Sequence, residues 1–166
     1  MRLLLLRHGD ALPAVTDDQS RPLSLSGEEQ SRRAGEFLVR VQAAIDILLS
    51  SPLLRAQQTG HIVSDIVSPG KTETTEHLVP SSDPRNLVET LNRSRGNVIL
   101  CVGHEPHMSV LISFLISGSR NTRVMMEKGG MACLELTPPI TPGKGVLCWL
   151  VPNEMMVPTE GRTGAR

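Results

Sequence analysis

The sequence predicts an α/β fold, a three-layer α/β/α sandwich with a mainly parallel central sheet. Short apolar runs typical of buried strands alternate along the chain with segments whose apolar residues recur at helical spacing. Strands and helices that alternate in this way predict parallel strands joined by right-handed crossovers. The 166 residues fit one domain. We expect this domain to span residues 1–157 and the tail over residues 158–166 to be disordered, because it lacks core-forming residues.

The chain opens with a predicted strand, a loop and a helix. Residues 2–6 form a continuous apolar run that suits a fully buried strand, and a polar, loop-like stretch follows over residues 10–25. Ser26 and Glu29 are spaced as a capping box, which predicts the start of a helix there. Apolar residues as far as Val41 continue this helix at regular spacing.

A second strand and helix follow directly. Residues 45–50 are predicted to form the strand. Ser51 and Pro52 then predict a helix with the serine as N-cap and the proline as the first helical residue. Pro69-Gly70 ends this helix, and another strand is predicted around residues 72–78.

The second half repeats the alternation and ends in strands. Asp83-Pro84 begins a helix, and residues 97–102 form the clearest buried strand of the chain. Residues 103–106 turn this strand into an apolar helix. Two further runs, residues 131–136 and 146–151, are predicted strands joined by a loop rich in proline and glycine.

Three segments place polar residues directly after predicted strands, namely residues 7–9, 51–55 and 103–106. Each segment alone has an ordinary explanation: a hydrogen-bonded structural histidine, a solvated arginine or a glycine in a tight turn. In an open α/β sheet, however, ligands bind beyond the carboxyl ends of the strands. The shared position of the three segments at one sheet edge therefore favours a functional site.

The residue types in these segments favour a phosphoryl group as the ligand. The guanidinium groups of Arg7 and Arg55 match phosphate oxygens in pairs and stay charged at any working pH. Helices predicted to begin at Pro52 and Pro106 direct free N–H groups and positive dipole ends toward the same space. One neutral imidazole can attack phosphorus while a second donates to the equatorial oxygens, which divides a difficult displacement into two easier steps.

Four motifs in these regions resemble those of the histidine phosphatase superfamily, and more closely its small SixA-type branch, the phosphohistidine phosphatases. They are LLLLRHGDA at residues 3–11, SRPLSLSG at residues 20–27, SSPLLRAQQT at residues 50–59 and CVGHEP at residues 101–106. The similarity covers roughly residues 1–152. It implies a phosphoglycerate-mutase-like fold.

The resemblance also implies roles for individual residues. His8 corresponds to the covalent nucleophile, Arg7 and Arg55 to the ligands of the phosphoryl group, and His104 to a stabiliser of the transition state. The implied enzyme is a phosphatase that acts without a metal or other cofactor. The sequence agrees, because it has no HExxH motif and no cluster of carboxylates.

Five further residues are candidates for the site. Gly9 completes the R-H-G motif and is expected to contact substrate, and Arg21 is either an additional anion contact or the cap of a loop. Asp10, Asp18 and Glu105 are candidates for a general acid. Ordinary roles for the last two are a loop turn and a carboxylate in the first turn of a helix.

A missing insertion bears on the acid and on the substrate. Larger relatives such as the phosphoglycerate mutases carry a helical insertion that supplies an acid, but residues 56–103 have room only for the rest of the Arg55 helix, one strand and one more helix. The pocket should then be open. A phosphohistidine leaving group accepts its proton on the free ring nitrogen, so a strong acid is less necessary.

These considerations favour phosphohistidine on a protein as the substrate. A small phosphate ester on the same fold is the alternative. A non-catalytic phosphate-binding module is a third possibility, although binding alone needs no nucleophile, and a mutase is the least favoured.

Composition restricts the other functions. The formal net charge is zero, so we expect no general attraction to nucleic acid or to an anionic membrane. The four leucines after Arg2 are too short a run for a signal peptide or a membrane span, which favours a cytoplasmic protein. Cys101, Cys133 and Cys148 lie in apolar runs and are expected to be buried, reduced thiols in an aliphatic core.

Overall fold

The computed structural model describes residues 1–14 and 17–157, so the tail predicted to be disordered lies outside the described residues. The strands are β1 (Arg2–Arg7), β2 (Ile47–Ser50), β3 (Lys71–Thr74), β4 (Val98–Gly103), β5 (Met131–Glu135) and β6 (Val146–Val151). The helices are α1 (Leu25–Arg40), α2 (Leu54–Val67), α3 (Pro84–Arg93) and α4 (His107–Ser117), with short 3-10 helices η1 (Glu76–Leu78) and η2 (Asn153–Met156).

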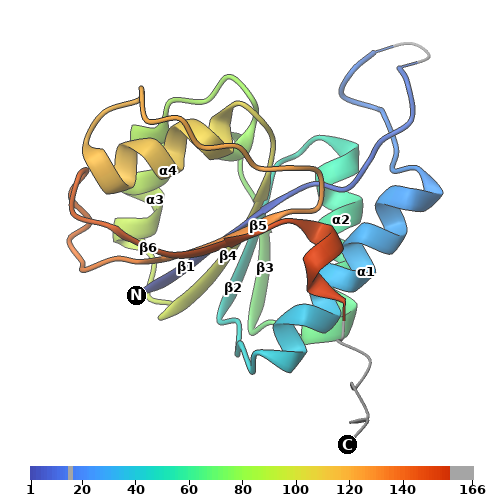
Figure 1. The fold of residues 1–166 in the computed structure, drawn as a ribbon, viewed down its shortest axis with the longest axis horizontal. Helices are drawn as coiled ribbons and strands as arrows, with labels where there is room; N and C mark the ends of the chain where they lie inside the picture. Colours follow the sequence, from blue (N-terminus) through green and yellow to red (C-terminus); the bar gives the residue numbers. More distant parts are fainter. Residues whose placement is uncertain (15–16, 158–166) are drawn as a thin grey trace, which may run out of the picture.

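The strands form one sheet in the order β3-β2-β4-β1-β5-β6. β3, β2, β4 and β1 are parallel, whereas β5 and β6 are antiparallel to their neighbours. Helices α1 and α2 cover one face, and α3 and α4 cover the other (Figure 1). The predicted three-layer α/β fold with a mainly parallel sheet is confirmed.

The leucines of β1 divide the core into two layers. Leu3 and Leu5 belong to the cluster that includes apolar residues of α3 and α4, and Leu4 and Leu6 belong to the cluster that includes those of α1 and α2. All four side chains are almost completely buried. Successive side chains of a strand point to opposite faces, so a continuous apolar run is what a strand covered on both sides requires.

Helix α1 begins earlier than predicted. Its N-cap is Ser24, whose hydroxyl accepts from the Gly27 N–H at 3.1 Å, and not Ser26, which is exposed. Hydrogen bonds to Asp10 fix Ser24, because its N–H donates to the Asp10 carbonyl at 3.0 Å and its hydroxyl to the Asp10 carboxylate at 2.8 Å. The predicted capping box is wrong, since Glu29 pairs with Arg32 instead.

Helix α2 begins later than predicted. The Ser51 N–H donates to the Val102 carbonyl at 3.0 Å, which continues the β2–β4 pairing and keeps Ser51 extended. The N-cap is Leu53, without a side-chain cap, and the Leu54 N–H donates to the Gln19 carbonyl at 3.0 Å. Ser51 is therefore not the cap, and Pro52 precedes the helix.

Two smaller expectations also change. The third strand is shorter than predicted, because residues 76–78 form the 3-10 helix η1. Cys101 and Cys133 are buried free thiols as predicted, but Cys148 is exposed because it lies on β6, at the edge of the sheet.

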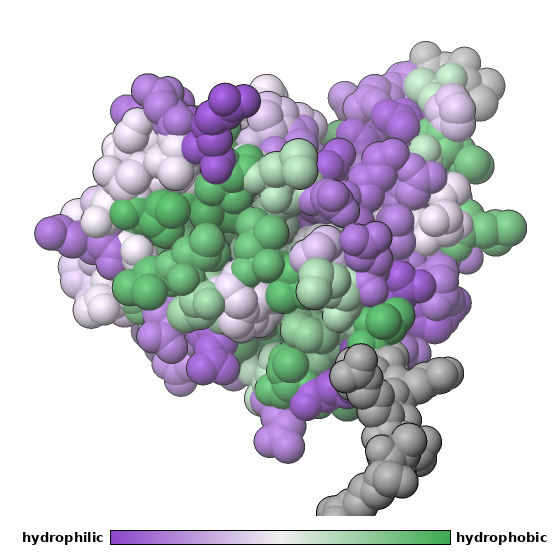
Figure 2. Space-filling model, in the orientation of Figure 1, coloured by the Kyte–Doolittle hydropathy of each residue, from purple (hydrophilic) through white to green (hydrophobic). Residues whose placement is uncertain are grey.

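The surface over β6 is largely apolar, whereas the surface over α1 is largely polar (Figure 2). No helix within the described residues has both the length and the apolar character needed to span a membrane.

The cap assignment gives a stability prediction. Ser24→Ala removes the acceptor of the Gly27 N–H, so it should lower the free energy of unfolding by about 1 kcal/mol, within the range of roughly 0.5–2 kcal/mol known for N-caps. Ser26→Ala is the matched control in the same turn and should change it by less than about 0.5 kcal/mol. Urea unfolding of the two variants measures both values, and a larger loss for Ser26→Ala would contradict the cap at Ser24.

Candidate active site

The pairing of β1 with β4 brings two histidines together. Arg7 is opposite Gly103 in the parallel register, and the pairing extends one residue further, because the His8 N–H donates to the Gly103 carbonyl at 3.0 Å. His8 and His104 thus leave the ends of adjacent strands side by side. Their ring centroids are 4.8 Å apart, with ring planes inclined by 55°.

His8 has a defined tautomer. Its Nδ1 is 2.6 Å from the Gly9 carbonyl oxygen, which can only accept, so Nδ1 carries the proton. Nε2 is then the basic nitrogen, and it accepts from Arg55 Nε at 3.3 Å. Burial, with smaller effects from the charges of Arg55 and Arg7, lowers the pKa of His8 to about 4 against the effect of the Gly9 hydrogen bond. At neutral pH His8 is an uncharged imidazole with a lone pair on Nε2.

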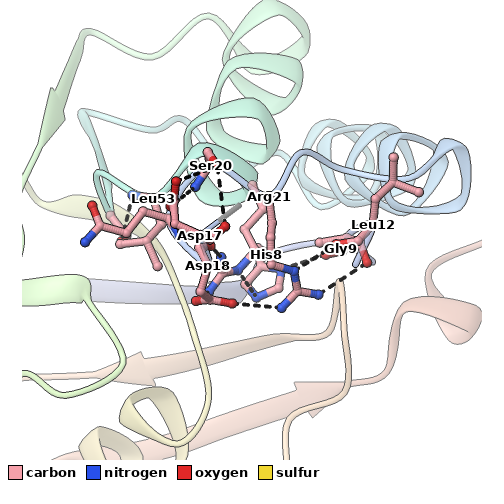
Figure 3. A network of polar contacts seen from close by, with 12 residues as sticks. His8, Gly9, Leu12, Asp17, Asp18, Ser20, Arg21 and Leu53 are labelled. Atoms are coloured by element: carbon pink, nitrogen blue, oxygen red, sulfur yellow. Dashed lines mark hydrogen bonds and ion pairs between the residues drawn. The ribbon is translucent and has the colours of Figure 1, made fainter. Parts of the chain in front are cut away.

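Arg55 is a buried cation in the first turn of α2. Besides its contact with His8, its Nη1 donates to the Asp18 backbone carbonyl at 2.6 Å and its Nη2 to the Asp18 carboxylate at 3.0 Å. Asp18, Arg21 and His8 lie in one network of polar contacts (Figure 3). In this state the Asp18 carboxylate is bound to the Arg55 guanidinium group next to the His8 ring.

Arg7 and His104 contribute buried nitrogens without hydrogen-bond partners. Arg7 Nη1 donates to the Met126 carbonyl at 2.7 Å, but Nε has no partner in the described chain. Neither ring nitrogen of His104 has one, and burial, with smaller effects from His8 and Arg55, lowers the pKa of His104 to about 3. Buried polar atoms are almost always hydrogen-bonded in proteins. These atoms beside His8 therefore indicate the place of a ligand.

Gly9 positions His8 and has no free donor for a substrate. Its carbonyl orients the imidazole, and its N–H donates to the Thr59 hydroxyl at 3.2 Å. A Cβ at Gly9 would lie 2.3 Å from the Gly27 carbonyl oxygen, so only glycine allows this approach to α1. In this state Gly9 has a packing and orienting role, and a substrate contact through Gly9 stays a prediction.

Thr59 is a residue of the site that the sequence reasoning missed. Its hydroxyl donates to the Arg55 carbonyl at 2.8 Å and accepts from Gly9, so it joins α2 to the loop after β1. Ser31 of α1 also contacts Thr59, because the hydroxyl oxygens of Ser31 and Thr59 are 3.3 Å apart. Helix α1 is thereby connected to the same buried group. The available signal was the threonine that ends the SSPLLRAQQT motif, four residues after Arg55.

Arg21 holds the loop that carries Asp18. Its Nε donates to the Leu12 carbonyl at 2.8 Å, and its Nη1 donates to the Asp18 carboxylate at 2.9 Å. Of the two roles predicted for Arg21, the loop contact is the one observed in this state. The hydrogen bond from Arg21 and then that from Arg55 hold the pKa of Asp18 below its usual value, against partial burial.

The other two acid candidates have separate partners. Asp10 pairs with Lys128 and accepts from the Ser24 hydroxyl, and these two contacts lower the pKa of Asp10. The Glu105 carboxylate accepts from the Ser109 hydroxyl at 2.6 Å within the start of α4. Neither has a contact with His8, Arg55 or His104 among those observed in the described residues.

His107 is a third buried histidine that the sequence reasoning did not single out. It is the first residue of α4, and both its ring nitrogens lack partners in the described chain. Burial lowers the pKa of His107 to about 4, and its charged form would lower the pKa of His104. Within residues 1–14 and 17–157, no three His, Cys, Asp or Glu side chains converge where they could hold a metal ion.

Comparison with known proteins identifies the family. A model described as the histidine phosphatase superfamily (branch 1) matches residues 3–79, which include Arg7, His8 and Arg55. The chain is 29% identical over 153 residues to the phosphohistidine phosphatase SixA of Escherichia coli, covering 90% of this chain and 92% of the relative. It is 34% identical over 127 residues to an uncharacterized protein of Mycobacterium tuberculosis, covering 74% of this chain and 77% of that protein. The chain belongs to the histidine phosphatase superfamily.

Solved structures of other proteins agree with this assignment. The protein histidine phosphatase SixA complexed with tungstate superposes with a TM-score of 0.86 at 27% identity, covering 95% of this histidine phosphatase and 100% of that chain. The alpha-ribazole phosphatase from Shigella flexneri shares the fold with a TM-score of 0.72 at 19% identity, covering 92% and 97% of the two chains. The resemblance to the SixA-type branch, first drawn from four short motifs, is confirmed.

The contact between Asp18 and Arg55 gives a prediction about anion binding to this histidine phosphatase. Asp18→Asn removes the negative charge that competes for Arg55, so inorganic phosphate should inhibit the variant at a concentration about two- to fivefold lower. This range corresponds to an exposed ion pair worth up to about 1 kcal/mol. Isothermal titration with phosphate measures the affinity directly.

Asp65→Asn is the matched control, because it removes the same charge from an exposed position in the last turn of α2, where Asp65 pairs with His61. It should leave phosphate affinity unchanged. Weaker phosphate binding by Asp18→Asn alone would mean that Asp18 supports the anion site and does not compete for it.

Proposed function

We propose that this histidine phosphatase removes phosphate from phosphohistidine on a protein substrate, through a covalent phosphohistidine intermediate at His8. The observation that carries the proposal is the neutral His8 ring, whose Nε2 lone pair is directed at Arg55 beside unpartnered nitrogens of Arg7 and His104. The phosphohistidine phosphatase SixA of Escherichia coli, similar over most of both chains, supports the same activity.

The first step is an attack by His8 Nε2 on phosphorus. The new Nε2–P bond forms as the bond to the substrate imidazole breaks, and the electron pair leaves with that imidazole. A proton on its second ring nitrogen makes it a neutral leaving group. The ring of His8 becomes cationic, and the Gly9 carbonyl, which accepts from Nδ1, stabilises that charge.

The second step is hydrolysis of the intermediate. Water attacks phosphorus, the Nε2–P bond breaks and its electron pair returns to Nε2, so His8 is again a neutral imidazole. Both protons of the water remain on the phosphate that is released. No step requires a metal ion, because the arginines supply the positive charge that the transferring group needs.

The remaining site residues bind the transferring group. Arg55 and Arg7 offer guanidinium donors to its oxygens, and His104, neutral under the influence of its burial, offers one ring N–H. A phosphoryl group that binds the Arg55 Nη2 donor now used by Asp18 takes the place of that carboxylate. We assign Arg21 to the Asp18 loop and Gly9 to the orientation of His8.

The states of the carboxylates favour phosphohistidine over an ester. Hydrogen bonds from arginine or from Lys128 and Ser24 lower the pKa of Asp18 and Asp10, so both are ionised at neutral pH in the free protein. An ionised carboxylate cannot protonate an alkoxide leaving group. An imidazole that is protonated on its free nitrogen does not need this help.

A groove beside the site favours a substrate displayed on a protein. It has a volume of about 450 Å³ and is lined by Asp18 and Leu53 on the side of α2 and by Val79 and Pro80 after η1. Asp18 connects it to Arg55, so polypeptide flanking a phosphohistidine has room there. The cytoplasmic location, the absence of nucleic-acid and membrane partners and the domain limits of 1–157 stay predictions.

The nucleophile assignment predicts a trapped intermediate. His8→Ala should lower the turnover of a phosphohistidine protein by at least about 10³-fold, as the loss of a covalent nucleophile does. The wild-type chain, quenched in alkali after mixing with ³²P-labelled substrate, should carry label that acid removes. His8→Ala should carry none. His61→Ala, at an exposed histidine of α2, is the control and should retain both label and turnover.

Comparison of two substrates tests the acid and the substrate class together. On phosphohistidine, Asp10→Asn, Asp18→Asn and Glu105→Gln should each lower kcat less than tenfold, about 1.4 kcal/mol. An ester substrate would instead need one of them, at a cost on the order of 10²–10⁴-fold. A large loss on phosphohistidine for one variant, or higher kcat/KM on a panel of alkyl phosphates, would support the small-ester phosphatase. All activities are expected to be equal with and without EDTA.

A further inference from the structure

Two cysteines line the same pocket at the end of the sheet opposite the active site. The pocket has a volume of about 180 Å³ and lies between the start of β1, the segment after α1 and strands β5 and β6. Cys133 of β5 and Cys148 of β6 line it together with Trp149, and Arg2 and Glu135 are at its rim. His8 follows the other end of β1, so these thiols have no part in the phosphatase mechanism.

A β-bulge is the reason that both thiols are in one pocket. Cys133 is opposite Trp149 and Leu134 is opposite Leu147, so Cys148 is the additional residue of β6. In a regular strand Cys148 and Trp149 would point to opposite faces of the sheet. The bulge interrupts this alternation, and both side chains line the pocket that Cys133 also lines.

The two thiols interact, and their exposures differ. Cys133 is buried and Cys148 is exposed, and the Cys148 thiol is near enough to contribute to the raised pKa of Cys133. The pKa of Cys133 is raised to about 11, chiefly by burial and to a smaller extent by the neighbouring Cys148. Cys133 is thus held as a thiol, while Cys148 is the sulfur that a solute can reach.

We propose that Cys133 and Cys148 form a reversible oxidation site, at which a peroxide converts the dithiol into a disulfide between β5 and β6. The exposed Cys148 thiolate attacks one oxygen of hydrogen peroxide, the O–O bond breaks, and a sulfenic acid and hydroxide result. The Cys133 sulfur then attacks the Cys148 sulfur. The S–S bond forms, the S–O bond breaks, and the oxygen leaves as water with the Cys133 proton.

The strand geometry suits this bond. Residues opposite each other on neighbouring antiparallel strands have Cα atoms about 4.5–5.5 Å apart, within the range of roughly 4.4–6.8 Å that disulfides require. Trp149 is the residue directly opposite Cys133, and Cys148 is the additional bulge residue next to it, so the two cysteines are neighbours across the β5–β6 pair. Cys101 lies in a different core layer, among residues of the α3 and α4 side, and is not available as a partner.

The test is oxidation of the full chain by hydrogen peroxide, followed by unfolding, alkylation and intact-mass measurement. The oxidised wild type should be lighter by about 2 Da, the two hydrogens lost to the peroxide, and only Cys101 should remain open to alkylation. Dithiothreitol should restore all three alkylation sites. Peptide mapping should find Cys133 joined to Cys148.

Three variants locate the bond. Cys148→Ala and Cys133→Ala should each abolish the loss of mass, whereas Cys101→Ala, the matched control at the third cysteine, should retain it. The proposal fails if the wild type keeps three alkylation sites, gains oxygen without an internal bond or forms a disulfide-linked dimer. Because the wild-type measurement needs no substitution, it decides the proposal even where a variant folds poorly.

Discussion

The register between β1 and β4 is the constraint on which the rest of the structure depends. The same pairing that places Leu3 opposite Ile99 places Arg7 opposite Gly103, and it sends His8 and His104 out of the sheet as neighbours. Because side chains alternate along a strand, a slip by one residue would exchange the two leucine layers and turn His8 toward the other face. The core and the pairing of His8 with His104 therefore depend on the same feature, the burial of β1 on both faces.

Burial then decides the electrostatics of the site. Removal from water is the main reason that His8 and His104 stay uncharged, and the positive charge of Arg55 adds to that effect on both rings. Arg55 is itself buried but is not an isolated charge, because Asp18 supplies a carboxylate and a carbonyl oxygen. The arrangement places a neutral His8 imidazole in a positive environment, which the Asp18 carboxylate partly balances. It is the state that an attack on a phosphoryl dianion needs.

The sequence predicted the strands and the residues gathered at the carboxyl ends of β1, β2 and β4, because those depend on apolar patterns and on motifs within a few residues of one another. It failed where the deciding contact is distant. Ser24 caps α1 because Asp10 holds it, and Ser51 stays extended because Val102 accepts its N–H. The contact of Asp10 with Lys128, 118 residues away in the chain, likewise lies beyond the reach of a local pattern. The exposure of Cys148 depends on the position of β6 at the edge of the sheet, which short-range patterns do not contain.

The carboxylate of Asp18 is attached to the site by its own loop, and this has a consequence for selectivity. A tethered carboxylate competes for Arg55 at an effective concentration on the order of millimolar or more. This is comparable with the concentration of the small anions that surround a protein. Chloride, acetate and similar monoanions gain little by exchanging with it. A dianion that also reaches Arg7 and His104 gains contacts that Asp18 does not make. The Asp18 loop thus selects anions by charge and shape. An anion that cannot replace the Asp18 carboxylate at Arg55 does not occupy the site beside His8.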